Sequence, residues 1–589
     1  MKQYNRHSLE NTARAVDHTG VSSRAATLIC NSYAMDMGWL TRENRLTDTL
    51  SKTKLDRWRV VERGKITKGE VKVINSRPIR GFYYDGKNTA TLIKLLGKSG
   101  KFFPRSVIQD HYAIIKEPDG IFLGHVTPDS GQGISIAVAI FCFLKARGWE
   151  KDIVVIGCDG TNTNVGNVKG SIQYLEKLLG HSLEWNICLL NANELPFRAE
   201  FALYDGKTSG PSSFKGPLGK ELQQDLTSRK PIRFAPIKNS EFPQLPEDVA
   251  TDLSSDQEYL YDMSWAVIEG RVDDDLAYRQ PGSLCHSRWL TMANRILLLY
   301  VTTRSPSMAL KRMAFIVIQF YAPCWFWIKS HPKSIDGPKN LLKMIEFSRK
   351  LSKKEQEVAQ KAIQRNAFYA HPEVILKTML ADEDEAKRKK AVSMILQLRA
   401  AKEGEQDEKG EEEREKEEDG YDEEDEEEEE TEEEVAEEEV AEEGAKGGRQ
   451  KKNKELADAF NVGVNLEPEE LEAIQCANIR KFVVPKLNFH ATDYPDLINW
   501  TETTFFEPPF TANFSDQDIR NLEFQPLAVP AFPCHTQSVE RAIRLITEAA
   551  SSVIGPEARD GFIRQRIKSR KEFGRCDGKE TIVKKLEKE

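Results

Sequence analysis

The sequence predicts an α/β protein, in which a mixed five-stranded sheet is interrupted by a large all-α insertion and preceded by a small helical unit. Three observations predict this class. Apolar runs between residues 80 and 191 follow the order β-β-β-α-β-α-β. Helical spacing then dominates to about residue 530, and an amphipathic segment with helical spacing follows Pro533. A chain of 589 residues has room for two or three folded units.

The predicted sheet region has a recognisable order of elements. In chain order these are strands at 80–86, 107–117 and 120–128, a helix at 130–148, a strand at 152–160, a helix at 166–180 and a strand at 183–191. Three hairpin-connected strands followed by right-handed crossovers give a mixed sheet with helices on its faces. That order is the order of a ribonuclease H-like core.

Two predicted strands end in the same pattern, Asp-Gly-x-Asn-Thr. It occurs in "YYDGKNTA" with Asp85 and in "GCDGTNTN" with Asp159. We expect these aspartates to end the first and fourth strands, which lie side by side in such a sheet. The glycine after each aspartate allows a tight turn that leaves the carboxylate exposed. Each pattern alone is also an ordinary strand-ending turn.

Segments with helical spacing fill most of the remaining chain. The N-terminal residues 1 to about 60 contain several with polar N-terminal caps. Further helices are predicted at 256–279, 287–303, 306–330, 337–351, 353–369, 372–402, 466–480 and 493–506.

The segment after Pro533 is the candidate for a third acidic residue. Its apolar stripe consists of Val539, Ala542, Ile543, Ile546, Ala549, Ala550 and Val553. Glu540 lies in the first turn, at the edge of that stripe, where a helix docked on the sheet could bring it to the two aspartates. A glutamate in the first turn also favours the helix dipole without any chemistry.

Three converging carboxylates would offer only hard oxygen ligands. Such a set suits Mg²⁺ or Mn²⁺ and suits zinc poorly. Two such ions about 4 Å apart can activate water and stabilise the leaving oxygen in phosphodiester cleavage. Asp85, Asp159 and Glu540 are therefore both the candidate metal ligands and the candidate catalytic residues.

The charge is distributed unevenly along the chain. Residues 402–450 hold 28 acidic and 6 basic residues, a local net charge of −22 within a total of −9, so the rest of the chain carries +13. We expect the acidic tract to be a disordered insert, because it cannot bury enough apolar surface to fold. The basic remainder permits a polyanionic partner.

Composition also bounds the cellular setting. The N-terminus lacks the apolar core of a signal peptide, and no stretch reaches the roughly 18–20 unbroken apolar residues of a membrane helix. Nine scattered cysteines favour free thiols over a disulfide framework. We therefore expect an intracellular protein without a membrane partner.

The ordered motifs resemble those of hAT-superfamily transposases, cut-and-paste DNA enzymes with an interrupted ribonuclease H-like core. The resemblance covers about residues 80 to 560 and depends on motif order. Its elements are Asp85, "CDGTNTN", "CLLNANELP" from Cys188, "CHSRWLT" with Arg288-Trp289, "YPDLINW", and "CHTQSVERAIRLIT" with Glu540.

The resemblance implies roles for particular residues. Asp85, Asp159 and Glu540 would form the metal-binding catalytic triad. Arg288 and Trp289 would lie at the cut DNA end, where a tryptophan can stack on an extruded base. The family's Cys-x-x-His motif would begin at Cys188, but its fourth position here is Asn191.

Two features depart from the family pattern. Asn191 replaces the histidine, and the usual N-terminal zinc-binding DNA reader is missing. Trp289 could be plain core and Arg288 a structural ion-pair partner. The chain could therefore be a divergent transposase or a host-domesticated derivative that binds DNA without cutting it.

The expected organisation combines these observations. The domains are a helical unit at 1–60, the first part of the core at 78–192, a helical insertion at 193–400, the acidic tract at 402–450, the end of the insertion with a dimerisation-like segment at 451–530, core helices at 531–575 and a basic tail at 576–589. We expect a nuclear, self-associating, DNA-binding protein whose acidic tract contacts histones or other basic proteins.

Two other functions compete with the leading hypothesis. One is a non-enzymatic DNA-binding or chromatin-binding scaffold. The other is an ATPase of the actin and sugar-kinase type, which shares the strand order and places Asp-Gly-Thr turns against phosphates. The latter needs a second complete sheet, which residues 192–530 do not predict.

Overall fold

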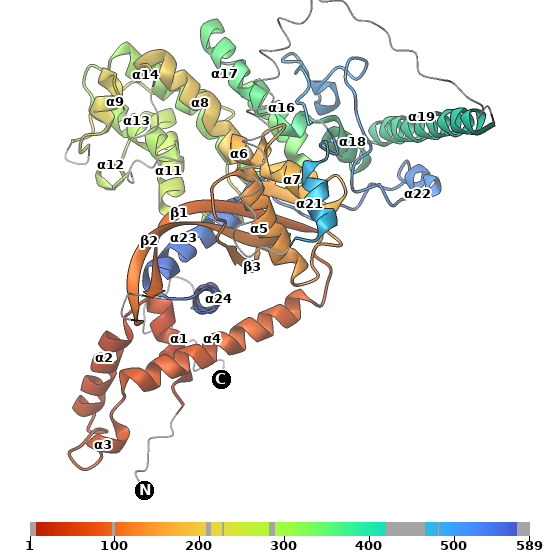
Figure 1. The fold of residues 1–589 in the computed structure, drawn as a ribbon. Helices are drawn as coiled ribbons and strands as arrows, with labels where there is room; N and C mark the ends of the chain where they lie inside the picture. Colours follow the sequence, from red (N-terminus) through yellow and green to blue (C-terminus); the bar gives the residue numbers. More distant parts are fainter. Residues whose placement is uncertain are drawn as a thin grey trace, which may run out of the picture. The chain divides into compact units, whose positions relative to one another are not determined.

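The computed structural model describes residues 8–96, 100–207, 214–226, 229–281, 289–418, 466–480 and 482–573, and gives the backbone alone at 403–418 and 570–573. Within these residues the protein is mostly helical and contains one five-stranded sheet with the order β3-β2-β1-β4-β5 (Figure 1). The predicted α/β class and number of strands are confirmed.

The sheet combines antiparallel and parallel pairs. Strands β1 (Gly81–Leu96), β2 (Phe102–Glu117) and β3 (Ile121–Val126) form an antiparallel series. Strands β4 (Val155–Cys158) and β5 (Glu184–Ile187) pair in parallel. Helix α5 (Gly133–Lys145) connects β3 to β4, as predicted.

The first hairpin is longer than predicted, which corrects the expected position of Asp85. Strands β1 and β2 each contain 16 residues, and their pairing continues from Gly81↔Glu117 to Leu96↔Phe102. Asp85 therefore lies inside β1, opposite Ala113. The apolar and β-branched residues that follow Asn88 extend the ladder, so the Asp-Gly dipeptide does not end the strand.

The fifth strand is shorter than predicted. It ends at Ile187, and Cys188 is the N-terminal cap of helix α8 (Leu189–Asp205). Leu189 and Leu190 are buried in the first turn of that helix. The motif "CLLNANELP" thus belongs to a strand-to-helix junction, and Asn191 lies in the first turn of α8.

The chain divides into two compact units. The first contains residues up to Ile153 together with those from Gln537 onward, and the second runs from Val154 to Thr536. The expected first core segment, 78–192, is therefore shared between the two units. Strands β1–β3 belong to the first unit and β4–β5 to the second.

The first unit combines the hairpin with the two ends of the chain. Its other elements are α1 (Glu10–Thr19), α2 (Ser23–Asp36), α3 (Arg45–Asp48), α4 (Lys52–Ile74), α5, α23 (Gln537–Ser552) and α24 (Pro556–Phe573). Helix α23 packs against β1 and β2, and α24 packs against α1, α4 and α23.

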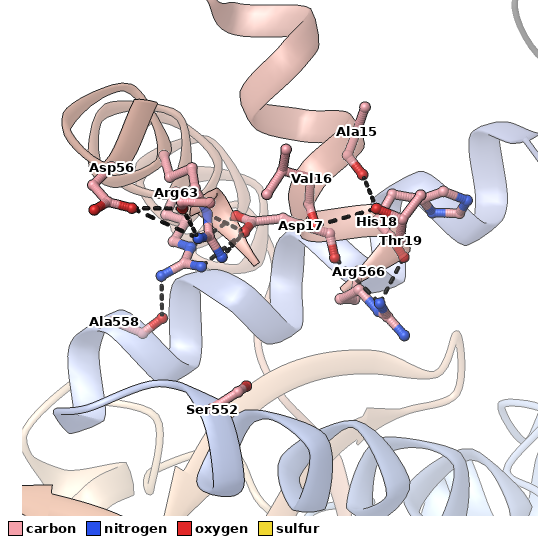
Figure 2. Close-up of polar contacts among 12 residues, drawn as sticks. Ala15, Val16, Asp17, His18, Thr19, Asp56, Arg63, Ser552, Ala558 and Arg566 are labelled. Carbon is pink, nitrogen blue, oxygen red and sulfur yellow. Dashed lines mark hydrogen bonds and ion pairs between the residues drawn. The ribbon is translucent and has the colours of Figure 1, made fainter. Parts of the chain in front are cut away.

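A buried ion pair joins α1 to α4 in this unit. Arg63 donates from Nε and Nη2 to the two carboxylate oxygens of Asp17, each at 2.8 Å (Figure 2). Arg566 of α24 donates to the backbone carbonyl of His18 at 2.6 Å. The N-terminal helices are therefore fixed to α24 by charged hydrogen bonds as well as by apolar packing.

The second unit is largely helical. Its helices are α6 (Asn162–Val165), α7 (Ser171–Leu179), α8, α9 (Pro217–Leu222), α10 (Glu247–Thr251), α11 (Ser255–Glu269), α12 (Asp274–Tyr278), α13 (Leu290–Thr302), α14 (Met308–Ile316), α15 (Ala322–Ser330), α16 (Gly337–Ser348), α17 (Lys353–Arg365), α18 (Pro372–Leu380), α19 (Glu385–Glu418), α21 (Pro468–Gln475) and α22 (Asp516–Asn521). Four short helices complete it: the π-helix η1 (Val317–Tyr321) and the 3₁₀ helices η2 (Ser334–Asp336), η3 (Phe368–Ala370) and η4 (Tyr494–Leu497).

Two details of this unit refine the sequence predictions. The helix predicted at 306–330 is interrupted, because the π-helix η1 lies between α14 and α15, just before Pro323. The helix predicted at 493–506 is wrong, because only Tyr494–Leu497 is helical, as a 3₁₀ turn. No helix among the described residues is long and apolar enough to cross a membrane.

The segment after residue 465 returns to the edge of the sheet at β5. Arg480 donates to Glu373 at 2.8 Å and also to the backbone carbonyl of Leu183. The ring of Phe482 stacks between Trp185, with centroids 4.1 Å apart, and His371, at 3.9 Å. A buried guanidinium and an aromatic stack therefore close this part of the second unit.

Candidate functional site

Asp159 is fixed by hydrogen bonds within the turn that follows β4. It follows β4 directly, and its Oδ1 accepts hydrogen bonds from the Thr161 hydroxyl at 2.9 Å, the Thr161 backbone N–H at 3.3 Å and the Asn164 amide at 2.6 Å. Asn164 in turn accepts a hydrogen bond from the Ser171 hydroxyl at 3.0 Å. These contacts all end on Oδ1, so Oδ2 makes none of the bonds that fix the turn.

The surroundings of this turn include one predicted residue. A side-chain carbon added at Gly160 would lie 3.7 Å from Oδ1 of Asn191 and 4.0 Å from Oδ1 of Asn366. Two carboxamides therefore border the Asp159 turn within the second unit. The resemblance gave Asn191 the motif position of a histidine, and in the structure it borders the turn that carries Asp159.

Cys188 is joined to the same strand ends but is not available as a ligand. Its backbone N–H donates to the carbonyl of Cys158 at 3.0 Å, and its side chain is almost fully buried. Burial raises the pKa of the Cys188 thiol, although hydrogen bonds with Thr536 and neighbouring backbone groups oppose the shift. The buried, protonated thiol therefore packs as part of the core.

Asp85 has a different setting in the first unit. Its Oδ1 accepts a hydrogen bond from the Gly86 backbone N–H at 2.7 Å, within a continuous strand. The ring of Tyr112 covers Gly86, because a side-chain carbon there would lie 2.3 Å from the ring. Asp85 is partly buried and belongs to the ladder rather than to a turn.

Glu540 lies on α23, as predicted, and the apolar stripe of this helix is buried. The buried members are Val539, Ala542, Ile543, Ile546, Ala549, Ala550 and Val553. Glu540 itself is partly buried at the edge of that stripe.

The first turn of α23 is anchored where β1 begins. Ser538 donates to Glu117 at 2.5 Å, and Glu117 is the partner of Gly81. Asp85 lies four residues further along β1, a distance of ~13 Å at the usual rise of a strand. Glu540 is two residues beyond Ser538, in the same first turn of α23.

The three candidate metal ligands are distributed over both units. Across the residues that the structure describes, no three His, Cys, Asp or Glu side chains form a group that could hold a metal ion together. Asp85 and Glu540 lie on packed elements of one unit without forming such a group, and Asp159 belongs to the other unit. The chemical type of the donors fits Mg²⁺ or Mn²⁺.

Trp289 is a core residue in the second unit. It is 3 % exposed and packs edge-on against Phe197 and Phe201, with ring centroids 5.9 and 5.5 Å away. It could stack on a DNA base only after leaving this cluster. Its neighbour Arg288 lies outside the described residues. The same holds for residues 419–465, which include most of the acidic tract, and for the tail from residue 574 onward.

The sequence interpretation missed Asn164 and Asn366 beside Asp159, and Thr536 beside Cys188. Asn164 was readable, because an asparagine shortly after an aspartate at a strand end is typical of side-chain-stabilised turns. Asn366 and Thr536 come from segments far away in the chain, and no local pattern marks them.

The comparisons with known proteins do not assign the chain to a family. No family model, no curated protein and no solved structure matches it.

Proposed function

We propose that the protein is a DNA-binding protein of the transposase-like kind, built on a ribonuclease H-like core. The strand order β3-β2-β1-β4-β5 and the long helical region between β5 and α23 support this proposal. The observation that carries it is Asp159, a carboxylate held by one oxygen directly after β4. Nuclear location and self-association remain part of the same proposal.

The chemistry assigned to this core is metal-dependent phosphodiester hydrolysis and strand transfer. Asp85, Asp159 and Glu540 would hold Mg²⁺ or Mn²⁺, which supplies water activation and charge stabilisation when bound. Asp159 is prepared for this role, because Thr161 and Asn164 fix its carboxylate. Glu540 lies on α23, which packs against β1, the strand that carries Asp85.

A non-enzymatic DNA-binding scaffold is the second candidate. Two observations favour it: Trp289 is locked in an aromatic cluster, and the three carboxylates form no metal-binding group within the described part of the chain. In this alternative the core would position DNA-binding surfaces, and the acidic tract would contact basic proteins. The ATPase alternative loses support, because the described residues contain one sheet and not two.

A cleavage assay on the full-length protein separates the two candidates. Labelled duplex DNA is incubated with Mg²⁺ or Mn²⁺ and with the wild type, Asp85→Asn, Asp159→Asn, Glu540→Gln and Asp152→Asn. Asp152 is exposed and lies shortly before β4, so its variant controls for the loss of one acidic charge. The enzymatic proposal predicts cleavage that only the first three substitutions abolish, whereas DNA binding without cleavage supports the scaffold.

A further inference from the structure

The β1–β2 hairpin extends far beyond the rest of the sheet. Strand β3 pairs with β2 only between Tyr112 and Lys116, and β4 has only four residues. Beyond Gly86 the hairpin therefore continues as a two-stranded ribbon to Leu96 and Phe102 (Figure 1). We use the name β-arm for residues 86–96 and 100–111.

One face of the β-arm is covered by its own unit. Thr91 and His111 are fully buried, and the Thr91 hydroxyl lies 2.7 Å from Nε2 of His111. Side chains alternate between the two faces along a strand. The odd-numbered residues of β1 and their partners on β2 therefore lie on the same face as Thr91 and His111. The covered face fixes the base of the β-arm.

The other face of the β-arm exposes several large apolar side chains among polar ones. It carries the pairs Ala90↔Ile108 and Leu96↔Phe102. Ile108, Leu96 and Phe102 are 68 %, 63 % and 65 % exposed. A two-stranded ribbon is marginally stable alone, and large exposed apolar side chains on it indicate a contact surface.

The charge of the β-arm selects the kind of partner. Lys87, Lys94, Lys101 and Arg105 are all exposed. Among the described residues of the β-arm the one acidic side chain is Asp110, which is paired with Asn88 near the base, so the net charge of the β-arm is positive. Within the described part of the chain, none of these four cations has an ion pair. A second copy of the β-arm would meet four like charges, whereas a polyanion complements them.

The shape of the β-arm fits a nucleic acid groove. A two-stranded ribbon can enter the major groove of B-DNA, which is about 12 Å wide. Lys94 and Arg105 occupy adjacent rows on opposite faces of the ribbon, so they point toward opposite walls of a groove that holds it. Phe102 and Leu96 lie at the distal end, where apolar side chains can contact the bases.

We propose that the β-arm binds duplex DNA, with its four cations on the phosphates and its distal apolar pair against the bases. This assignment deepens the proposed function and rests on it, because it takes DNA as the polyanion. It is independent of metal chemistry, since it uses none of the three candidate carboxylates.

Fluorescence anisotropy with a labelled 30-base-pair duplex tests the β-arm in the full-length protein. The variants are Lys94→Gln/Arg105→Gln and Phe102→Ser, all at exposed positions, so the fold is retained. The control is Lys354→Gln/Lys361→Gln on α17, which removes two exposed cations elsewhere. The double β-arm variant should bind about tenfold more weakly, and the slope of log affinity against log salt should fall by about 2.

Each other outcome has a definite meaning. The β-arm assignment is overturned if the α17 control loses as much DNA affinity as the double β-arm variant. It is also overturned if both β-arm variants bind DNA as tightly as the wild type. It also fails if Phe102→Ser lowers the molecular mass by light scattering without changing DNA affinity, because the β-arm would then bind a second copy. If the wild type does not bind the duplex at low salt, the β-arm assignment and the proposed DNA binding fail together; metal-dependent cleavage that survives in the β-arm variants leaves the proposed function standing.

Discussion

The two copies of Asp-Gly-x-Asn-Thr adopt different structures. Around Asp159 the pattern forms a turn that leads into α6, with the carboxylate holding Thr161 and Asn164. Around Asp85 the same pattern continues a strand for eleven more residues, to Leu96. The local sequence permits both outcomes, and the partner decides: β2 offers a ladder of 16 residues to Asp85, whereas the four-residue pairing of β4 with β5 ends at Cys158.

The two glycines sharpen this comparison most. At Gly86 an added methyl group would lie 2.3 Å from the Tyr112 ring, whereas at Gly160 the nearest atom would be 3.6 Å away. We expect Gly86→Ala to lower the free energy of unfolding by about 2 kcal/mol through overpacking of the hairpin. Urea unfolding would measure the loss, and hydrogen exchange should locate it in β1 and β2. If Gly86→Ala were as stable as the wild type, the Tyr112 ring would not restrict the strand at this position.

Asn164 tests whether the Asp159 turn depends on its side-chain bonds. Asn164→Ala removes the 2.6 Å bond to Asp159 and leaves the buried Ser171 hydroxyl without this partner. The free energy of unfolding should fall by about 1.5 kcal/mol, as measured in urea. Asn88→Ala, at an exposed asparagine of the other copy, should change it little. Equal losses in both variants would contradict the contrast between the turn and the strand.

The stability of the sheet beside Asp85 should depend on pH. His125 faces Ala113, the partner of Asp85, and burial together with the charges of Arg559 and Arg564 lowers the pKa of His125 to about 4. Burial and the neighbouring His125 likewise lower the pKa of His111 to about 4. The unfolded chain binds these protons near pH 6.5, so stability is present above pH 6.5 and is lost as the pH falls toward 4.

His125→Gln isolates part of that pH dependence. The wild type should lose more stability between pH 7 and pH 5 than the variant, by about 1 kcal/mol in urea unfolding. Both histidines belong to the first unit, whereas the Asp159 turn belongs to the second. Amide hydrogen exchange in β4 and β5 should therefore change less with pH than exchange in β2 and β3. Identical pH profiles would show that His125 is not held neutral by its surroundings.

Gly160→Ala should have the smallest effect. An added methyl group meets only ordinary contacts with Ile187, Asn191 and Asn366. We expect the free energy of unfolding to stay within about 0.5 kcal/mol of the wild type. A loss as large as that of Gly86→Ala would mean that the two copies share a tight requirement for glycine.

Much of the fold was predictable because it depends on periodicity. The order of the strands, the α5 crossover and the apolar stripe of α23 follow from spacings of two and 3.6 residues. The extension of β1 past Asp85 and the early end of β5 were not predictable, because they depend on pairing with other strands and on packing of α8.

The candidate site was predictable only in part. Asp159 and Asn191 came from motifs, and the structure places them beside one turn. The burial of Trp289 against Phe197 and Phe201 joins residues about ninety positions apart, which single motifs do not reveal. Ser538 and Glu117 fix the first turn of α23 through a contact that spans most of the chain.

Iron-directed cleavage of the protein backbone tests the proposed metal site most directly. Fe²⁺ replaces Mg²⁺ in the full-length protein, and ascorbate with peroxide generates hydroxyl radicals that cut the chain near the bound iron. The account predicts cuts beside residues 85, 159 and 540 in the wild type, and their joint loss in Asp159→Asn but not in Asp152→Asn. A single metal site would be contradicted by cuts confined to the acidic tract at 402–450, or by cuts near residue 85 that persist in Asp159→Asn. Either result would favour the non-enzymatic DNA-binding scaffold.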